Sequence, residues 1–179
     1  MKLTTPLALL ALISGGHSLI IKRDFPVRWV LTDVLNRTIE LDYAVGNFTN
    51  KFQPVADGAD NLIKSIDNAQ RVANNTPTRM RHSEVTLIIA PFRLLQGKAE
   101  DLFDTFEDRK EDVKKAKACG ITHEKLGIIG ETISKMMRTV TNKVKFPWAL
   151  FVVKRHAKHI RKLLADTQSL FSETNCIDG

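Results

Sequence analysis

The chain has 179 residues, of which 43% are hydrophobic and 26% charged, and its formal net charge is +7. This length and mixed composition are typical of a single globular domain and exclude a disordered chain. With only two cysteines and no internal repeat, the sequence also excludes cysteine-rich scaffolds and repeat arrays.

The N-terminus has the features of a secretory signal peptide. Lys2 provides a positive start, residues 7–13 form an apolar run, and small residues at positions 14–18 suit cleavage. A transmembrane anchor is the alternative, but the run is far shorter than the roughly 20 apolar residues that a span needs. We therefore expect residues 1–18 to be a signal peptide, and the protein to be secreted, extracellular or in a cell wall, without a transmembrane anchor.

A dibasic pair, Lys22-Arg23, follows the signal and precedes Asp24. Two ordinary surface cations would look the same, but the position indicates a processing site. It predicts a short propeptide, residues 19–23, and a mature single domain, residues 24–179. Removal of residues 1–23 takes away Lys2, Lys22 and Arg23 and no acid, so the mature charge becomes 24 − 20 = +4.

The first predicted helix covers residues 27–48. Its apolar residues recur at steps of three and four and form one stripe: Val27, Val30, Leu31, Val34, Leu41, Val45 and Phe48. Two glycosylation sequons begin at Asn36 and Asn47, which lie about 20° apart on a helical wheel and nearly opposite the stripe. A third sequon begins at Asn74. Chance occurrence is the alternative for each, but in a secreted chain we expect glycans at these three positions.

The same period continues through the rest of the chain. After Pro54 it predicts a second helix that ends before the turn cluster at residues 74–78. Ser83 is the predicted N-cap of a third helix, which runs through Pro91 with a kink to Val113 and stops at Gly120. Thr122 is the predicted cap of a fourth helix, and Pro147 suits the first turn of a fifth. No strand pair or hairpin signal is present. The sequence predicts an all-α fold, an antiparallel bundle of about five amphipathic helices.

Signatures of catalysis are missing from the sequence. There is no Gly-x-Ser-x-Gly elbow, glycine-rich phosphate loop or Cys-x-x-Cys pair. His156 and His159 are spaced to share a metal on a helix, but the surrounding Lys and Arg residues would repel a cation. A solvated helix face explains the carboxylates at positions 107, 108, 111 and 112 better than an acid/base pair does. We expect no enzyme activity, no cofactor and no metal site.

Cys119 and Cys176 are the only thiols. In an oxidising compartment they favour one intrachain disulfide between the turn after the third helix and the C-terminal tail. Two unpaired or intermolecular cysteines are the alternative.

Positive charge gathers in the second half of the chain. Residues 113–162 contain 13 Lys or Arg and two acids, a balance of +11, whereas residues 24–112 sum to −4. Secretion argues against nucleic acid as the partner. Anionic lipid headgroups or acidic wall polymers fit the patch better, although a solvated helix face has the same pattern.

Two segments of the mature chain carry a resemblance to a known family. They are VLTDVL at residues 30–35, which opens the first helix, and NLIKSIDNA at residues 61–69. Together with the signal peptide and the basic pair before Asp24, they resemble the hydrophobic surface-binding protein A family, which includes fungal cell-wall galactomannoproteins. The basic second half, the large aromatics and the two cysteines depart from the family's usual Ala-rich, Lys-poor composition.

The resemblance implies a secreted helical bundle that adsorbs to hydrophobic surfaces or, in the galactomannoprotein branch, encloses fatty acids in an apolar channel. An acyl chain gains about 0.8 kcal/mol per buried methylene, so burial would determine affinity. The expected lipid-binding residues lie on the helical stripes: Leu41, Ile66, Ile89, Phe92, Leu95, Phe103, Ile129, Ile133, Met136, Met137, Leu150 and Val153. Lys154 and Lys158 are the expected contacts for a carboxylate headgroup.

Three functions compete at this point. The first is a lipid-sequestering carrier, and the second is a coat protein whose helices open on a hydrophobic surface. The third is a secreted effector or antigen that binds a host protein through its basic face. Fatty acid retained by a closed monomer would favour the carrier over the coat, and salt-dependent capture of a host protein would favour the effector.

Overall fold

The computed structural model describes residues 26–49, 51–76 and 80–178. The predicted signal peptide and dibasic site lie outside the described residues. Within them the chain forms six α-helices and no strand. The helices are α2 (Pro26–Gly46), α3 (Gln53–Asn75), α4 (His82–Asp108), α5 (Lys110–Lys115), α6 (Cys119–Lys143) and α7 (Pro147–Leu170). The predicted all-α fold is therefore confirmed.

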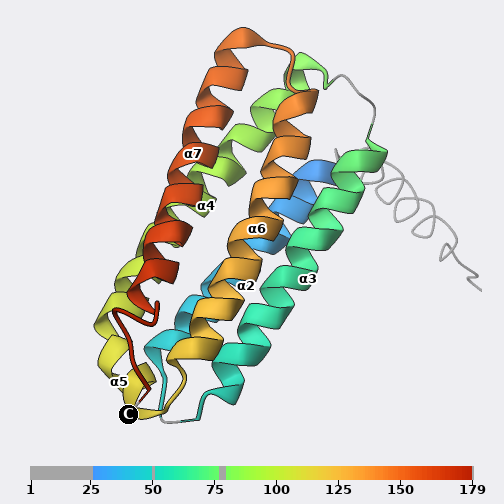
Figure 1. Ribbon diagram of the computed structural model, residues 1–179. Helices are drawn as coiled ribbons and strands as arrows, with labels where there is room; N and C mark the ends of the chain where they lie inside the picture. The colour runs from blue at the N-terminus through green and yellow to red at the C-terminus, as the bar shows by residue number, and fades with distance from the viewer. Residues whose placement is uncertain (1–25, 50, 77–79, 179) are drawn as a thin grey trace, which may run out of the picture.

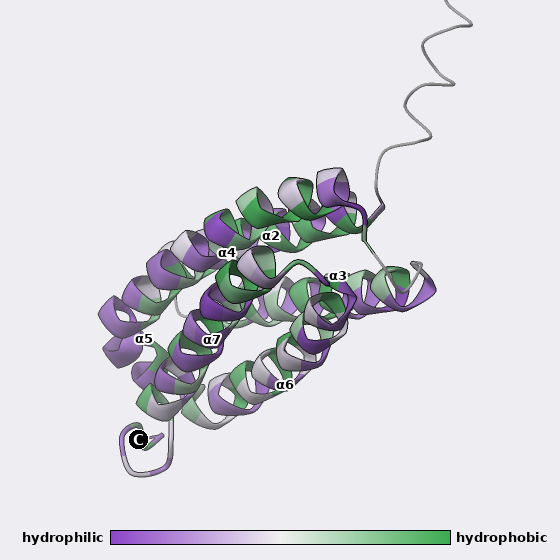
Figure 2. Ribbon diagram, turned by 90° about the horizontal axis from the view of Figure 1, so that it is seen from above, coloured by the Kyte–Doolittle hydropathy of each residue, from purple (hydrophilic) through white to green (hydrophobic). Residues whose placement is uncertain are grey.

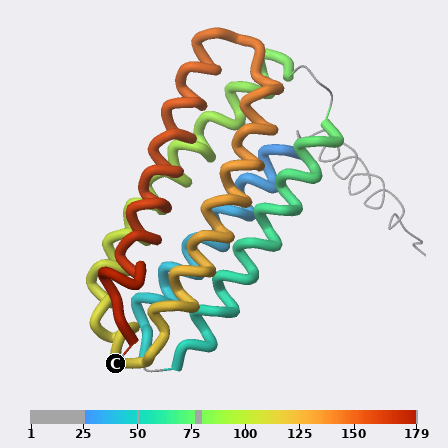
Figure 3. The backbone as a smooth tube through the Cα atoms, in the orientation of Figure 1, coloured from blue at the N-terminus to red at the C-terminus, as the bar shows by residue number. Residues whose placement is uncertain are grey.

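The five long helices close into a ring. Following their contacts, α3 packs on α2, α2 on α4, α4 on α7, α7 on α6, and α6 returns to α3. Successive long helices alternate in direction, as an antiparallel bundle requires (Figures 1 and 3). Because order around the ring differs from order along the chain, several neighbours in the ring nevertheless run parallel. The long helices surround one common core, and Figure 2 shows their arrangement from above.

The apolar stripes face this interior. On α2 the buried residues include Val27, Leu31 and Val34, in the phase that the sequence predicted. Pro54 and Pro147 lie in the first turns of α3 and α7, where a missing N–H costs no helical hydrogen bond. The helix α4 continues through Pro91, which is itself buried. Burial of one face of each helix supplies the main driving force for closing the ring.

The predicted third helix differs from the structure at its end. It breaks at Arg109 into α4 and the short α5, although Val113 remains buried as expected. The Arg109 guanidinium donates to the carbonyl oxygen of Gly46 at 2.6 Å, which fixes this corner to the end of α2. Gly120 is not the stop: it lies in the first turn of α6, and the chain reverses at Lys117, whose φ is 55°.

Two predicted caps are also wrong. The helix α4 begins at His82, so Ser83 lies inside it, and the Glu84 carboxylate accepts the Arg81 N–H at 2.6 Å instead. The helix α6 begins at Cys119, which places Thr122 inside its first turn. Both errors have one cause: short polar residues in a first turn look like caps when the tertiary contacts are unknown.

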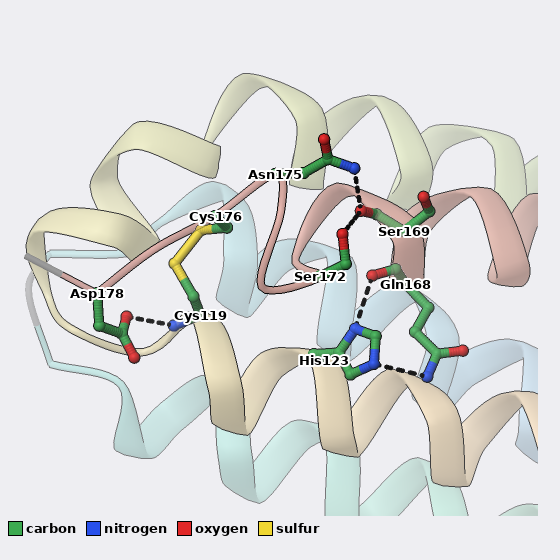
Figure 4. Close-up of a disulfide and its surroundings, with 8 residues drawn as sticks. All are labelled: Cys119, His123, Gln168, Ser169, Ser172, Asn175, Cys176 and Asp178. Atoms are coloured by element: carbon green, nitrogen blue, oxygen red, sulfur yellow. Dashed lines mark hydrogen bonds between the residues drawn. A yellow bond between two sulfur atoms is a disulfide. The ribbon is translucent and has the colours of Figure 1, made fainter.

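The disulfide favoured by the sequence is present. Cys119, at the start of α6, is bonded to Cys176 in the C-terminal tail, with their Cα atoms 5.7 Å apart (Figure 4). The Asp178 carboxylate accepts the Cys119 N–H at 2.9 Å. One turn along α6, His123 Nδ1 lies 3.0 Å from the carbonyl oxygen of Gln168 on α7. These contacts hold the tail and the end of α7 against the start of α6.

The three sequon asparagines are exposed. Asn36 lies on the outer face of α2 and Asn74 near the end of α3, whereas Asn47 follows the last residue of α2. Thr38 is the threonine of the sequon that begins at Asn36. It is buried, and its hydroxyl donates to the Val34 carbonyl oxygen at 2.9 Å. Glycan attachment at all three positions stays a prediction.

Candidate functional site

The interior of the ring contains most of the predicted lipid-binding residues. Nine of them are buried in one continuous core: Leu41, Ile66, Phe92, Leu95, Ile129, Ile133, Met136, Met137 and Val153. Ile89 and Leu150 are partly buried and pack against that core, and Phe103 is partly buried on α4. The structure thus brings residues from five helices to one apolar interior.

Side chains fill the part of this interior that the described residues surround. Large residues with almost no exposed surface, such as Phe92, Leu95 and Met136, occupy it along its length. The cavity found between α2, α3, α4 and α6 has a volume of only about 10 Å³, room for at most about one water molecule. Pockets for drug-sized ligands measure roughly 300–1,000 Å³. A lipid therefore needs the helices to separate and the side chains to rearrange.

One residue that lines this small cavity has a polar group with no partner among the described residues. Thr122 lines the cavity, its exposed fraction is 2%, and its Oγ1 makes no hydrogen bond within the part of the chain that is described. The other buried threonines differ: Thr38 and Thr141, for example, donate to carbonyl oxygens four residues earlier. An unpaired buried hydroxyl costs about 1–3 kcal/mol. The Thr122 hydroxyl is therefore available to a polar atom that enters the cavity.

A cation lies at the edge of the same cavity. Lys125, one turn along α6, contributes to its lining, and its side chain is about one quarter exposed. Its ammonium group donates to the Asp60 carboxylate on α3. The remaining lining is apolar: Leu41, Phe52, Val55, Ala59, Phe106, Leu126 and Ile129. The arrangement offers a hydroxyl donor and a positive charge at one end of an apolar interior.

The predicted headgroup lysines lie elsewhere. Lys154 and Lys158 are exposed and line a groove of about 320 Å³ between α6 and α7, together with Arg138 and Arg161. Met137 and Ala157, both buried, form part of its floor. This groove is a second place where positive charge borders the apolar core.

His156 and His159, whose spacing could suit a shared metal, contact different partners in the structure. His156 Nδ1 lies 2.6 Å from Gln96 Oε1, and His159 Nε2 lies 2.9 Å from the Glu100 carboxylate. Within residues 26–49, 51–76 and 80–178 no group of three or more His, Cys, Asp or Glu side chains gathers as a metal site.

The carboxylates at 107, 108 and 111 are exposed, while Asp112 forms ion pairs with Arg109 and Lys115. In the part of the chain that the structure describes, these carboxylates lie on the outer surface or in ion pairs rather than in the interior. The candidate site thus combines apolar surface with one hydroxyl and one ammonium group.

We expect His156 to make the stability of the protein pH-dependent. Partial burial, followed by the positive charges of Arg155, Arg93 and His159, lowers its pKa below the ordinary 6.5. The unfolded chain then binds the proton more readily than the folded chain does. We expect the stabilising contribution to be complete above about pH 6.5 and to be lost as the pH falls through the lowered pKa. NMR titration of the His156 ring checks this, and a midpoint above 6.5 would contradict it.

Sequence reasoning missed Thr122, Lys125, Phe52 and Val55 as site residues. A signal for Thr122 was nevertheless present, because it lies four, seven and eleven residues before Leu126, Ile129 and Ile133 on the same apolar stripe. A threonine on such a stripe faces the interior rather than capping the helix. Nothing in the local sequence places Lys125 beside the cavity, because its side chain is held there by Asp60 on α3.

Comparison with protein families shows to which family the chain belongs. The family described as Hydrophobic surface binding protein A matches residues 27–143. The chain belongs to this family. Search of the curated proteins found no match. Within the residues described, none of its helices is long and apolar enough to cross a membrane.

Solved structures share the fold. Ligand-binding domain 1 of the Penicillium marneffei MP1 protein, complexed with arachidonic acids, is 16% identical with a TM-score of 0.75, over 80% of this chain and 94% of that one. Domain 2 of the same protein, also complexed with arachidonic acids, is 18% identical with a TM-score of 0.78, over 85% and 96%. Afmp4p in complex with palmitic acid is 13% identical with a TM-score of 0.77, over 82% and 98%. At these identities the likeness establishes a common fold.

Proposed function

We propose that this protein is a secreted, non-enzymatic carrier that binds a fatty acid or a similar single-chain lipid inside its helix ring. The observation that carries the proposal is a continuous apolar interior, enclosed by five helices, that ends at an unpaired buried hydroxyl. Proteins with the same fold have been solved with arachidonic and palmitic acids, which supports this ligand class.

The energetics favour a long acyl chain. Each methylene that leaves water contributes about 0.8 kcal/mol, so a chain of a dozen or more offsets a substantial cost of opening the ring. Met136 and Met137 suit this role because unbranched thioether side chains adapt to new shapes with little strain. Affinity then depends on chain length, and the polar end determines orientation.

We assign the polar end of the lipid to Thr122 and Lys125. The hydroxyl has no partner to give up, and the Lys125 ammonium is held beside the cavity by Asp60. A carboxylate there would accept one hydrogen bond from Thr122 and lie close to a positive charge. The alternative headgroup contacts, Lys154 and Lys158 in the α6/α7 groove, remain a competing assignment.

The Thr122→Val substitution separates stability from binding. It keeps the shape of the side chain and removes the unpaired hydroxyl, so the free protein should become more stable by up to about 1–3 kcal/mol. The affinity of the delipidated protein for palmitate should fall on the order of tenfold, because a hydrogen bond to a charged group is lost. Urea unfolding measures the change in stability, and native mass spectrometry of the delipidated protein with added palmitate measures the change in affinity.

Thr139→Val is the matched control, since the Thr139 hydroxyl donates to the Lys135 carbonyl oxygen and lies outside the cavity. It should leave palmitate affinity unchanged. If Lys154→Gln/Lys158→Gln weakens binding and Thr122→Val does not, the headgroup lies in the groove. If the purified protein retains no lipid and binds none, the carrier proposal fails.

Adsorption to hydrophobic surfaces is the second candidate function. The family's description favours it, and several large apolar side chains are exposed, including Tyr43, Leu94 and Phe151. In this case the ring would open and lay its apolar stripes on the surface. Loss of the closed ring on hydrophobic beads, seen by hydrogen exchange, together with no retained lipid, would support the coat over the carrier.

We also propose that residues 24–179 form one extracellular domain, located outside the cell or in the cell wall. The disulfide supports this, because such bonds persist mainly in oxidising compartments. Mass analysis of the protein from culture medium would give the mature N-terminus and the occupied sequons.

A further inference from the structure

The solvent face of α7 combines exposed aromatics with a row of cations. Trp148 and Phe151 lie in the first two turns of the helix, and Arg155, Lys158 and Lys162 continue the same face at steps of three and four residues. All five are exposed, whereas Ala149, Val153, Ala157 and Ile160 point into the core. The helix α7 itself runs along one side of the bundle (Figure 1).

The cations on this face have few counter-charges. Within the described chain, Arg155, Lys158 and Lys162 form no ion pair, and neither do Lys154 and Arg161 beside them. The neighbouring helices add Arg93 and Arg138, while Glu100 is engaged by His159. The only acid on α7 is Asp166, one turn beyond Lys162. The face therefore attracts an extended anionic surface rather than a single anion.

The aromatics show which kind of surface fits. Phe151 is 68% exposed and Trp148 46%, and Trp148 is held in place by the His82 ring, with centroids 5.7 Å apart. An exposed phenylalanine gains free energy only where water is excluded. Tryptophan and phenylalanine beside lysine and arginine are the pattern of helices that lie in the headgroup region of a bilayer.

We propose that the outer face of α7 docks on an anionic lipid bilayer. Trp148 and Phe151 enter the boundary between headgroups and acyl chains, and Arg155, Lys158 and Lys162 contact lipid phosphates. Docking leaves the ring closed and does not involve Thr122, so it is independent of the proposed interior site. It would place the α6/α7 groove beside a membrane, where a released or captured fatty acid is located.

Vesicle binding tests this surface. Trp29 and Trp148 are the only tryptophans, so the Trp29→Phe variant reports on Trp148 alone. Phosphatidylcholine vesicles containing phosphatidylglycerol should shift its emission to the blue and sediment the protein at low salt. Each cation near such a surface contributes about a fivefold gain in affinity, so Arg155→Gln/Lys158→Gln/Lys162→Gln should weaken binding on the order of 100-fold.

Matched controls come from other faces of the ring. Lys51→Gln/Lys64→Gln/Arg71→Gln removes three exposed cations near or on α3 and should cause little loss. Phe151→Ala should weaken binding, whereas Tyr43→Ala on α2 should not. Binding to pure phosphatidylcholine with equal strength, or equal losses for both triple variants, overturns the proposal. Thr122→Val should bind vesicles normally, which keeps this test separate from that of the interior site.

Discussion

Replacing Cys119 and Cys176 together by alanine should lower the free energy of unfolding by about 4 kcal/mol. The bond closes a loop across a sequence separation of 57 residues, and in the chain-entropy account a loop of this length gives a stabilisation of that size. The midpoint of thermal unfolding should fall by roughly 8–16 °C. Urea and thermal unfolding of the oxidised protein and the double variant measure the change.

Reduction of the unmodified protein is the control for this experiment. It breaks the same bond without changing a side chain, so its effect should match that of the double variant. Because His123 still contacts Gln168, the start of α6 should stay near the end of α7 in the folded state. Equal stability before and after reduction would show that the tail, not the bond, provides the anchor.

Truncating Phe92 to alanine should cost about 3–5 kcal/mol of stability. Phe92 has no exposed surface and is among the largest buried side chains in the interior. Its removal also leaves an apolar void within the region that we assign to the acyl chain. We therefore expect the folded variant to have a higher palmitate affinity than the unmodified protein. Fewer side chains of the interior must move to make room for the acyl chain.

Phe151→Ala is the matched control, since it removes the same atoms from an exposed position and should change stability by no more than about 0.5 kcal/mol. Phe92→Leu, a smaller truncation, should act in the same direction as Phe92→Ala and guards against loss of folding. Unchanged palmitate affinity of Phe92→Leu in a fully folded protein would mean that the acyl chain does not occupy this region.

The proposed lipid function and the proposed docking surface use different faces of the same helix. The inner face of α7 contributes Val153 and Ala157 to the core, and the outer face carries the unpaired cations. Opening of the ring and docking on a bilayer are therefore separable by substitution. Because Lys158 also lines the α6/α7 groove, Arg155→Gln/Lys162→Gln reports on docking alone, and Thr122→Val reports on the interior site alone.

Local pattern was sufficient to predict the helices, their buried faces and the disulfide. The three- and four-residue spacing of apolar residues reports directly which side of a helix leaves water, and Val27, Val34 and Ile66 are buried accordingly. The ends of helices were less predictable. Arg109 ends α4 through a contact with Gly46, 63 residues away, which no local pattern contains.

The sequence by itself determined the amphipathic helices, the pair of cysteines and the concentration of positive charge on α7. Only the tertiary structure decided the order of helices around the ring. That order places Thr122 and Lys125 at one small cavity and pairs Lys125 with Asp60 on α3. The reason is physical: a hydrophobic stripe specifies that a face must be buried, but the same stripe packs against any other. Which polar groups are buried with it depends on the neighbour that it meets.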